Sequence, residues 1–280
     1  MKITVKKDKL RLCTILLAVT AISMGLFVSC TKDMDGGSTN RLADGSCPMI
    51  FTSTVSKPVI TRITTESTWN GGEEIAIQVS GSEVKKYTVT DKNNGTLSSA
   101  DPLYWQSTND ITVNAWHQHT YSSTKPTVIV KADQSIPANY QASDYLEAKD
   151  AIVKFNQANS LTFTHRTAKV IATLVKGTGI TDIAGSTVRF VNLSSVENST
   201  EIIPYNGNAA LLAPQDMTGK AFIQVTLDGY TYSYTPTIGE ADLQAGTQYT
   251  YTITVNKTGL NVSLSSSPIW TGDTENVTSH

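Results

Sequence analysis

Residues 246–255 read Gly-Thr-Gln-Tyr-Thr-Tyr-Thr-Ile-Thr-Val and form the clearest predicted strand of the chain. Tyr249, Tyr251, Ile253 and Val255 are separated by single threonines. A period of two residues places these four large side chains on one face of an extended backbone. The stretch therefore predicts a strand with a buried apolar face and a wet threonine face.

The same alternation, interrupted by turn residues, recurs along most of the chain. The alternation is present at 74–80 and 110–116. The dipeptides Asn94-Gly95 and Asp228-Gly229 are typical of tight hairpin turns, because both residues of each dipeptide tolerate positive φ. One helical turn is expected within 137–145. No amphipathic pattern is longer than about three helical turns, which argues against a parallel βαβ fold. Short strands with frequent turns favour an all-β protein built from antiparallel sandwiches.

The chain length suits two domains rather than one. It has 280 residues, and one sandwich of ordinary size takes about 110 of them. We place the join in the polar stretch 156–160. We expect a signal peptide over residues 1–29, a flexible tether over 30–46, an N-terminal sandwich over 47–158, a C-terminal sandwich over 159–270 and a polar tail over 271–280.

The N-terminus predicts secretion followed by lipid anchoring. Basic residues between Lys2 and Arg11 precede an apolar run over 12–28, which is the pattern of a signal peptide. The run ends in Ser29-Cys30, and a small residue directly before a cysteine resembles a bacterial lipobox. In such lipoproteins the cysteine thiol receives a diacylglyceryl group, the preceding peptide is removed and the new N-terminus is acylated, for example with palmitate. A plain secretory leader or an uncleaved anchor is the alternative.

Composition excludes some classes of partner. The chain has 22 Lys and Arg against 24 Asp and Glu, which gives a formal net charge of −2. A nucleic-acid-binding protein needs a basic surface to displace counterions from phosphates. We therefore expect no nucleic-acid partner.

No group of residues in the sequence predicts catalysis, a cofactor or a metal site. His117 and His119 lie on one face of a predicted strand, but no third ligand is near them in sequence. Cys47 has no histidine or acid pattern around it and lies at the edge of the tether, so it is not nominated as a nucleophile. Tryptophans at 69, 105, 116 and 270 could stack on a sugar ring, although core packing is the commoner role.

Six stretches in a fixed order resemble a known family. They are Trp-Asn-Gly-Gly-Glu-Glu-Ile-Ala-Ile at 69–77, Pro-Leu-Tyr-Trp at 102–105, Ile-Thr-Val-Asn-Ala-Trp at 111–116, Ser-Asp-Tyr-Leu-Glu-Ala at 143–148, Leu-Thr-Phe-Thr-His-Arg-Thr-Ala-Lys-Val at 161–170 and Ala-Gly-Thr-Gln-Tyr-Thr-Tyr at 245–251. Together with the lipobox they look like the fimbrillin-like lipoproteins of Gram-negative gut and oral anaerobes. The resemblance implies two tandem transthyretin-like antiparallel sandwiches. It also implies a pilus subunit, tip or anchor in the fimbrium, attached to the outer membrane by lipid on Cys30.

The resemblance further implies assembly by strand exchange. In the family, a trypsin-like protease cuts after a basic residue, the first strand leaves, and an extended segment of a neighbouring subunit replaces it. Here Met49–Val55 is the candidate strand and Arg62 the preferred cleavage site, although Arg62 is equally well an ordinary surface residue. Cleavage at Arg41, the alternative, would remove only the tether. Residues 260–270 resemble the C-terminal donor region or form a normal last strand.

The sequence therefore leaves two functional hypotheses. The first is a structural fimbrial subunit, tip or anchor that acts in cell adhesion and has no enzymatic activity. The alternative is a surface lipoprotein that does not polymerise and binds a glycan or a host ligand.

Overall fold

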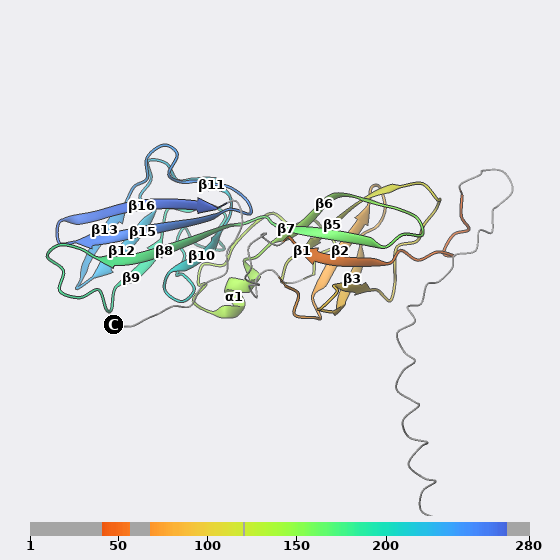
Figure 1. Cartoon of the computed structure of the whole chain (residues 1–280), viewed down its shortest axis with the longest axis horizontal. Coiled ribbons are helices and arrows are strands. Elements are labelled where there is room, and N and C mark those ends of the chain that lie inside the picture. The colour runs from red at the N-terminus through yellow and green to blue at the C-terminus, as the bar shows by residue number, and fades with distance from the viewer. Residues whose placement is uncertain (1–40, 57–67, 120, 268–280) are drawn as a thin grey trace, which may run out of the picture.

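The computed structural model describes residues 41–56, 68–119 and 121–267, and these form an all-β protein (Figure 1). The first half contains β1 (Phe51–Val55), β2 (Glu74–Val79), β3 (Lys85–Asp91), β4 (Thr96–Ser98), β5 (Ile111–His117), α1 (Pro137–Ala142), β6 (Leu146–Val153) and β7 (Asn159–His165). The second half contains β8 (Ala168–Lys176), β9 (Thr187–Phe190), β10 (Ala209–Leu212), β11 (Gln215–Asp216), β12 (Ile223–Leu227), β13 (Tyr230–Tyr234), β14 (Asp242–Leu243), β15 (Gln248–Asn256) and β16 (Gly259–Ser267). The all-β class and the short helix confirm the sequence-based predictions.

The first seven strands form a closed barrel in the order β1-β4-β3-β2-β5-β6-β7. All neighbouring strands in it are antiparallel except β1 and β7, which run parallel and close the barrel. The expected N-terminal sandwich is therefore corrected to a barrel that includes one parallel pair. Alternating hydrophobicity shows which face of a strand is buried, but not which strand lies beside it. A sheet that curls until its two edges pair leaves no edge exposed.

The second half holds two main sheets that share one core. One has the order β10-β8-β15-β16 and the other the order β13-β12-β9, while β11 and β14 form a short separate pair. Apolar side chains of both main sheets, including Val170, Phe190, Ile223 and Tyr251, belong to one buried cluster. The strand predicted over 246–255 is confirmed as β15. It runs parallel to β8 and antiparallel to β16, so the prediction of purely antiparallel pairing is wrong here too.

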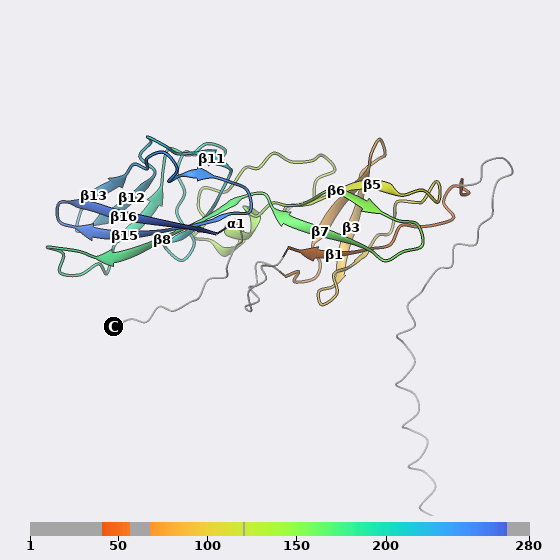
Figure 2. The same cartoon turned by 45° about the horizontal axis from the view of Figure 1, so that its top comes forward.

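The two halves follow one another along the longest axis of the molecule, with α1 between them (Figures 1 and 2). The chain passes from the barrel to the four-stranded sheet between His165, the last residue of β7, and Ala168, the first residue of β8. The predicted join at 156–160 falls at the start of β7, which pairs with β1 and β6 of the barrel. The proposed limits of the domains and their transthyretin-like topology remain predictions.

A long connection from the barrel covers one side of the second half. The part over residues 128–136, called the strap here, pairs with the segment that follows β9. The Val130 N–H donates to the Ser195 carbonyl at 3.0 Å, and the Ala132 carbonyl accepts from Ile203 N–H at 2.8 Å. The strap links the halves a second time, in addition to the covalent connection between β7 and β8.

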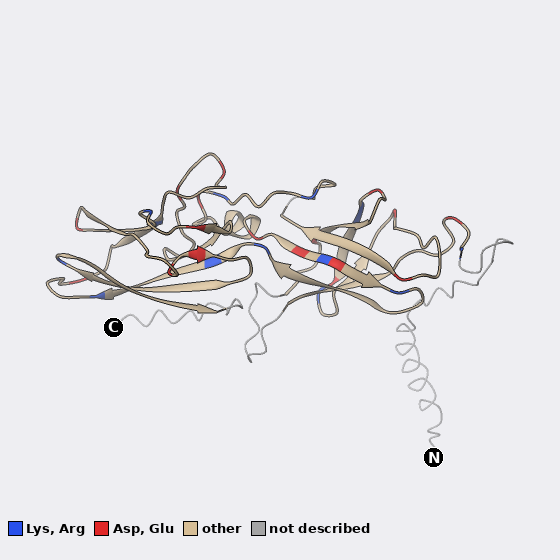
Figure 3. Cartoon of the chain, turned by 90° about the horizontal axis from the view of Figure 1, so that it is seen from above, with Lys and Arg blue, Asp and Glu red and all other residues tan. Residues whose placement is uncertain are grey.

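Charged residues are sparse on the strands of both halves (Figure 3). Within the described ranges, no helix has the length and apolar character needed to cross a membrane. The interior of each half is filled by large apolar side chains, each contributing about 1.5–3 kcal/mol when fully buried.

Candidate functional site

The candidate site is the groove that β1 fills in the barrel wall. Residues 41–56, called the segment here, turn at 43–46, where Ser46 N–H donates to the Ala43 carbonyl at 3.2 Å, and pair with neighbouring backbone on both sides of this turn. The Leu42 N–H donates to the Gln106 carbonyl at 3.0 Å, Met49 N–H to Leu103 at 2.8 Å and Ser56 N–H to Phe163 at 2.7 Å. The second part of the segment is β1, which runs parallel to β7. The pairing begins with Phe51 opposite Asn159 and ends with Val55 opposite Phe163.

The inward side chains of this segment are part of the barrel core. Cys47, Met49, Phe51, Ser53 and Val55 alternate with outward residues, and all five are buried. This spacing is that of a strand with one face in a core. The segment therefore contributes both a hydrogen-bonding backbone and a row of apolar groups.

Tyr87 of β3 lies under the segment and joins it to the neighbouring loop. Its ring meets Phe51 edge-on with 5.4 Å between centroids. Its hydroxyl accepts from Leu103 N–H at 2.9 Å and donates to the Met49 carbonyl at 3.3 Å. Burial raises the pKa of Tyr87 to about 12, although the Leu103 N–H opposes part of the increase. The hydroxyl therefore stays neutral and can donate to the segment.

Gly95 provides the second polar contact, in the turn between β3 and β4. Its carbonyl accepts from both Ser53 N–H at 2.8 Å and Ser53 Oγ at 3.0 Å. The Asn94-Gly95 turn was predicted from the sequence, but its contact with residue 53 was not. The two residues are 42 positions apart, and no local pattern shows that they meet.

Removal of residues 41–56 would leave a defined groove. The carbonyls of Gly95, Leu103 and Phe163 would lose their donors, and the apolar side chains packed against Phe51 and Val55 would be exposed. Buried backbone groups without partners are costly, so such a groove favours rebinding of an extended strand. The chemistry of this site is strand binding.

The predicted cleavage and lipidation residues are only partly within the described chain. Arg62 and Cys30 lie outside the described residues. Arg41 is exposed and forms an isolated bridge with Ser107. Residues 41–46 were expected in the flexible tether, yet Leu42 is buried in the barrel core. Cys47 is also a core residue rather than one at the edge of a tether.

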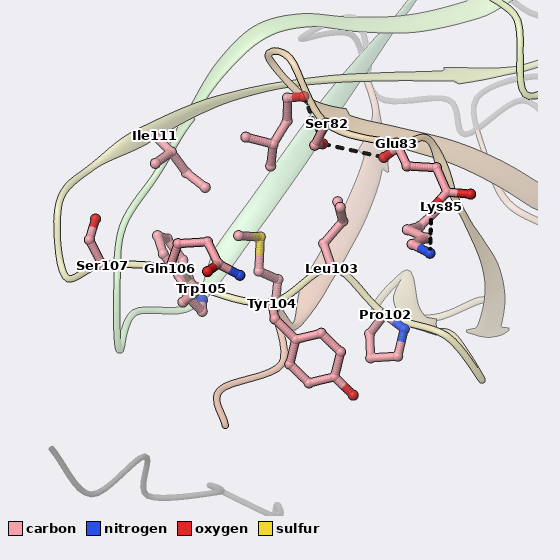
Figure 4. Close-up of a pocket in the computed structure, with 12 residues that line it drawn as sticks. Ser82, Glu83, Lys85, Pro102, Leu103, Tyr104, Trp105, Gln106, Ser107 and Ile111 are labelled. Carbon is pink, nitrogen blue, oxygen red and sulfur yellow. Dashed lines mark hydrogen bonds and ion pairs between the residues drawn. The ribbon is translucent and has the colours of Figure 1, made fainter. Parts of the chain in front are cut away.

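A pocket of about 280 Å³ lies beside the segment, and its lining includes Ser107, the bridge partner of Arg41 (Figure 4). Met49, Leu103 and Ile111 supply apolar lining. On its rim, Lys85 Nζ contacts Glu83 at 2.9 Å and Asp101 at 2.7 Å. Hydrogen bonds to these carboxylates raise the pKa of Lys85, so the ammonium keeps its charge. The two acids largely satisfy the positive charge of Lys85.

The other side chains considered from sequence have structural roles. Trp69, Trp105 and Trp116 are buried, so they present no exposed face to a sugar, while residue 270 is outside the described chain. His117 Nδ1 lies 2.8 Å from the Glu74 carbonyl, and its ring packs against Trp69. No group of three or more His, Cys, Asp or Glu in the described part of the chain could hold a metal ion.

The predicted donor region forms β16, which pairs with β15 over nine residues from Gly259 to Ser267. Leu260, Val262 and Leu264 face the core but are only partly buried. In the described chain, β16 has one strand neighbour and forms an edge of its sheet. Its side chains and its position are those of a strand held less firmly than the central β8 and β15.

Comparison with known proteins adds an independent finding. A family model described as fimbrillin-like matches residues 61–269. The fold is similar to a crystal structure of a candidate cell adhesion protein from Bacteroides uniformis, with a TM-score of 0.60 and 22% identity over 79% of this chain and 98% of the other. A candidate cell adhesion protein from Bacteroides ovatus gives a TM-score of 0.59 and 18% identity over 81% and 99% of the two chains. No curated protein matches the sequence.

Proposed function

Because the chain belongs to the fimbrillin-like family, we propose that it is a fimbrial subunit, tip or anchor protein that acts in cell adhesion and assembles by exchange of β1. Proteolysis between β1 and β2 releases the N-terminal segment, and an extended strand of another subunit takes its place. The two similar structures are described as candidate cell adhesion proteins, which agrees with this assignment.

The observation that carries the proposal is the position of β1. It is the closing strand of the barrel, and it is also the first strand of the described chain. A single cut after it therefore detaches a whole strand without breaking any other element. Loss of a strand from another position in the barrel would require two cuts.

The energetic consequence of losing β1 is large enough to favour assembly. Met49, Phe51 and Val55 each contribute about 1.5–3 kcal/mol through burial, and each ladder hydrogen bond contributes about 0.5–1.5 kcal/mol net. A donor strand of similar pattern restores both contributions. Because the donor comes from another molecule, the restored free energy stabilises the polymer.

Arg62 is the proposed cleavage site. The sequence between β1 and β2 contains two basic residues, Lys57 and Arg62, and Lys57 is followed by Pro58, which trypsin-like proteases cut poorly. Cleavage at Arg41 would leave β1 in the barrel. We further propose that lipid on Cys30 attaches the precursor to the outer membrane and that β16 of a second subunit is the donor. No enzymatic activity, cofactor or nucleic-acid partner is part of this proposal.

Limited trypsin digestion of the full chain tests the function. We expect a product whose first residue is Ile63 and which then forms ladders resistant to SDS. Arg62→Ala should prevent both the cut and the ladders, whereas Arg41→Ala should leave both unchanged. Membrane fractionation of Cys30→Ser should show release of the protein.

A trimmed protein that remains monomeric at high concentration would contradict assembly by strand exchange. That result would favour the alternative, a surface lipoprotein that binds a glycan or host ligand without polymerising. Trypsin digestion that cuts at Arg41 but never between β1 and β2 would give the same conclusion.

A further inference from the structure

The contact between β1 and Gly95 is a contact between two backbones. Ser53 is 1% exposed, and its N–H and hydroxyl both donate to the Gly95 carbonyl. A Cβ atom built on Gly95 would lie 1.8 Å from the Ser53 carbonyl oxygen and 2.8 Å from its carbon. The β1 backbone therefore occupies the space that a side chain at position 95 would need.

Gly95 also has a φ of +66°, which an L-residue with a side chain adopts only with strain. Glycine is required here twice, once for the turn and once for the approach of β1. The side chain of Ser53 is itself enclosed, because the residue is 1% exposed and its Oγ donates to the Gly95 carbonyl at 3.0 Å, so a larger inward side chain here would have to displace its neighbours.

The neighbouring inward positions accept much larger groups. Phe51 packs against Tyr87, and Met49 and Val55 are buried in the same core. The sizes of the inward side chains along the groove are therefore large at Met49 and Phe51, small at Ser53 and medium at Val55. Only one register of a strand with this order of sizes matches the groove.

A shifted strand would meet two different penalties. A shift of one residue turns the apolar side chains outward. A shift of two residues places a large side chain against Gly95, and overpacking a well-filled core is destabilising. A strand with a small residue at the right place avoids both.

We propose that the Ser53 position, held against Gly95, admits only a small side chain and thereby sets the register of any strand that fills the groove. This inference rests on the proposed strand exchange and specifies the partner strand. For β16 of a second copy, it places Ser266 at the position of Ser53 and Leu264 at the position of Phe51.

The sequence of β16 fits this register at the first three of the four inward positions, and Pro268, beyond the end of β16, would take the place of Val55. Val262, Leu264 and Ser266 have the same spacing as Met49, Phe51 and Ser53. The residues between them are uncharged in both strands, with Ser263 and Ser265 in β16 at the places of Ile50 and Thr52 in β1. The last strand thus has a small residue where the groove requires one.

The first test uses the intact chain. Ser53→Leu should lower the melting temperature by several degrees, the shift that a destabilisation of a few kcal/mol produces in a domain of this size. Thr54→Leu introduces a leucine at the adjacent exposed position and should leave the melting temperature almost unchanged. Equal melting temperatures for the two variants would overturn the inference, whether or not strand exchange occurs.

The second test measures entry of labelled peptides into the trypsin-cleaved full chain. Peptides with the sequences of residues 48–56 and 260–267 contain no basic residue and survive trypsin. We expect Ser53→Leu and Ser266→Leu to reduce incorporation at least tenfold, while Thr54→Leu and Ser265→Leu retain it.

The outcomes separate the two proposals. Incorporation of the Ser53→Leu or Ser266→Leu peptide at the level of its parent would overturn the register inference while leaving strand exchange intact. If neither parent peptide enters the cleaved chain, strand exchange itself is wrong, and the melting temperatures decide whether position 53 requires a small residue.

Discussion

The side-chain amide of Gln134 replaces a neighbouring strand for Leu211. Its Nε2 donates to the Leu211 carbonyl at 2.8 Å, and its Oε1 accepts from the Leu211 N–H at 2.8 Å. Leu211 belongs to β10, an edge strand of the four-stranded sheet. The strap therefore uses one buried side chain to satisfy an edge that would otherwise expose backbone groups. Through this contact the first half of the chain completes a sheet of the second half.

We expect Gln134→Leu to destabilise the protein by about 2–4 kcal/mol, because it leaves a buried N–H and a buried carbonyl of Leu211 without partners. Urea denaturation followed by tryptophan fluorescence measures the change. Gln141→Leu on α1 is the matched control, since Gln141 is exposed and its replacement should change stability by less than about 0.5 kcal/mol. Equal effects of the two changes would show that the Leu211 contact does not support the sheet.

Glu147 joins the barrel to two other segments. It is 4% exposed and contacts Lys125, from the connection before the strap, and Arg166 Nε at 3.2 Å, between β7 and β8. We expect Glu147→Gln to cost about 1–3 kcal/mol, because the buried carboxylate accepts from both cations and a neutral amide replaces those charged contacts only in part, while the half-exposed cations remain solvated. Glu201→Gln is the control, since Glu201 pairs with Arg189 at the surface and should cost at most about 1 kcal/mol. Equal denaturation midpoints for the two variants would contradict this role.

Local features of the fold could be predicted from the sequence because they depend on adjacent residues. The two-residue period identified β2, β5 and β15, and the turn residues identified the hairpins at Gly95 and Gly229. Pairings between distant segments could not be predicted. Thr52 pairs with Ser160, and Tyr249 with Val170, in parallel registers that no local pattern indicates. These two pairs change an expected sandwich into a barrel and an antiparallel sheet into a mixed one.

The candidate site was predicted in the same partial way. Met49–Val55 was identified as a strand from its composition, and β1 confirms this for Phe51–Val55. The groove around it depends on Tyr87, Gly95 and Phe163, which come from three separate strands or turns. Gln134 was missed because a polar residue in a connection normally faces solvent, whereas here its amide is used in place of a peptide group.

Phe51 and Ile50 are neighbours with opposite environments, so they form a matched pair for testing β1. Phe51 is buried, whereas Ile50 is 53% exposed. We expect Phe51→Ala to lower the free energy of unfolding by about 3–5 kcal/mol through loss of burial and creation of a cavity. Ile50→Ala should cost less than about 1 kcal/mol. Thermal and urea denaturation of the two variants measure the difference, and a larger loss for Ile50→Ala would show that β1 faces the other way.

The buried hydroxyl of Tyr87 should make stability depend on pH in the alkaline range. Its pKa is raised to about 12 in the folded protein, against about 10 in an unfolded chain. Between these values the unfolded chain loses the proton and the folded chain keeps it, so stability falls as pH rises, by up to about 1.4 kcal/mol per pH unit. The contribution is fully present below pH 10 and is lost as pH approaches 12.

Tyr87→Phe removes this titration, so the plot of unfolding free energy against pH from 8.5 to 11.5 should become less steep than in the parent chain. The variant should also be less stable at pH 8.5, because Leu103 N–H and the Met49 carbonyl lose the hydroxyl that joins them. Tyr230→Phe serves as the control, since Tyr230 is 70% exposed and its replacement removes no buried hydroxyl. An unchanged slope for Tyr87→Phe would mean that the Tyr87 hydroxyl is not held neutral beneath β1, and that the contact between β3 and the N-terminal segment is weaker than the geometry indicates.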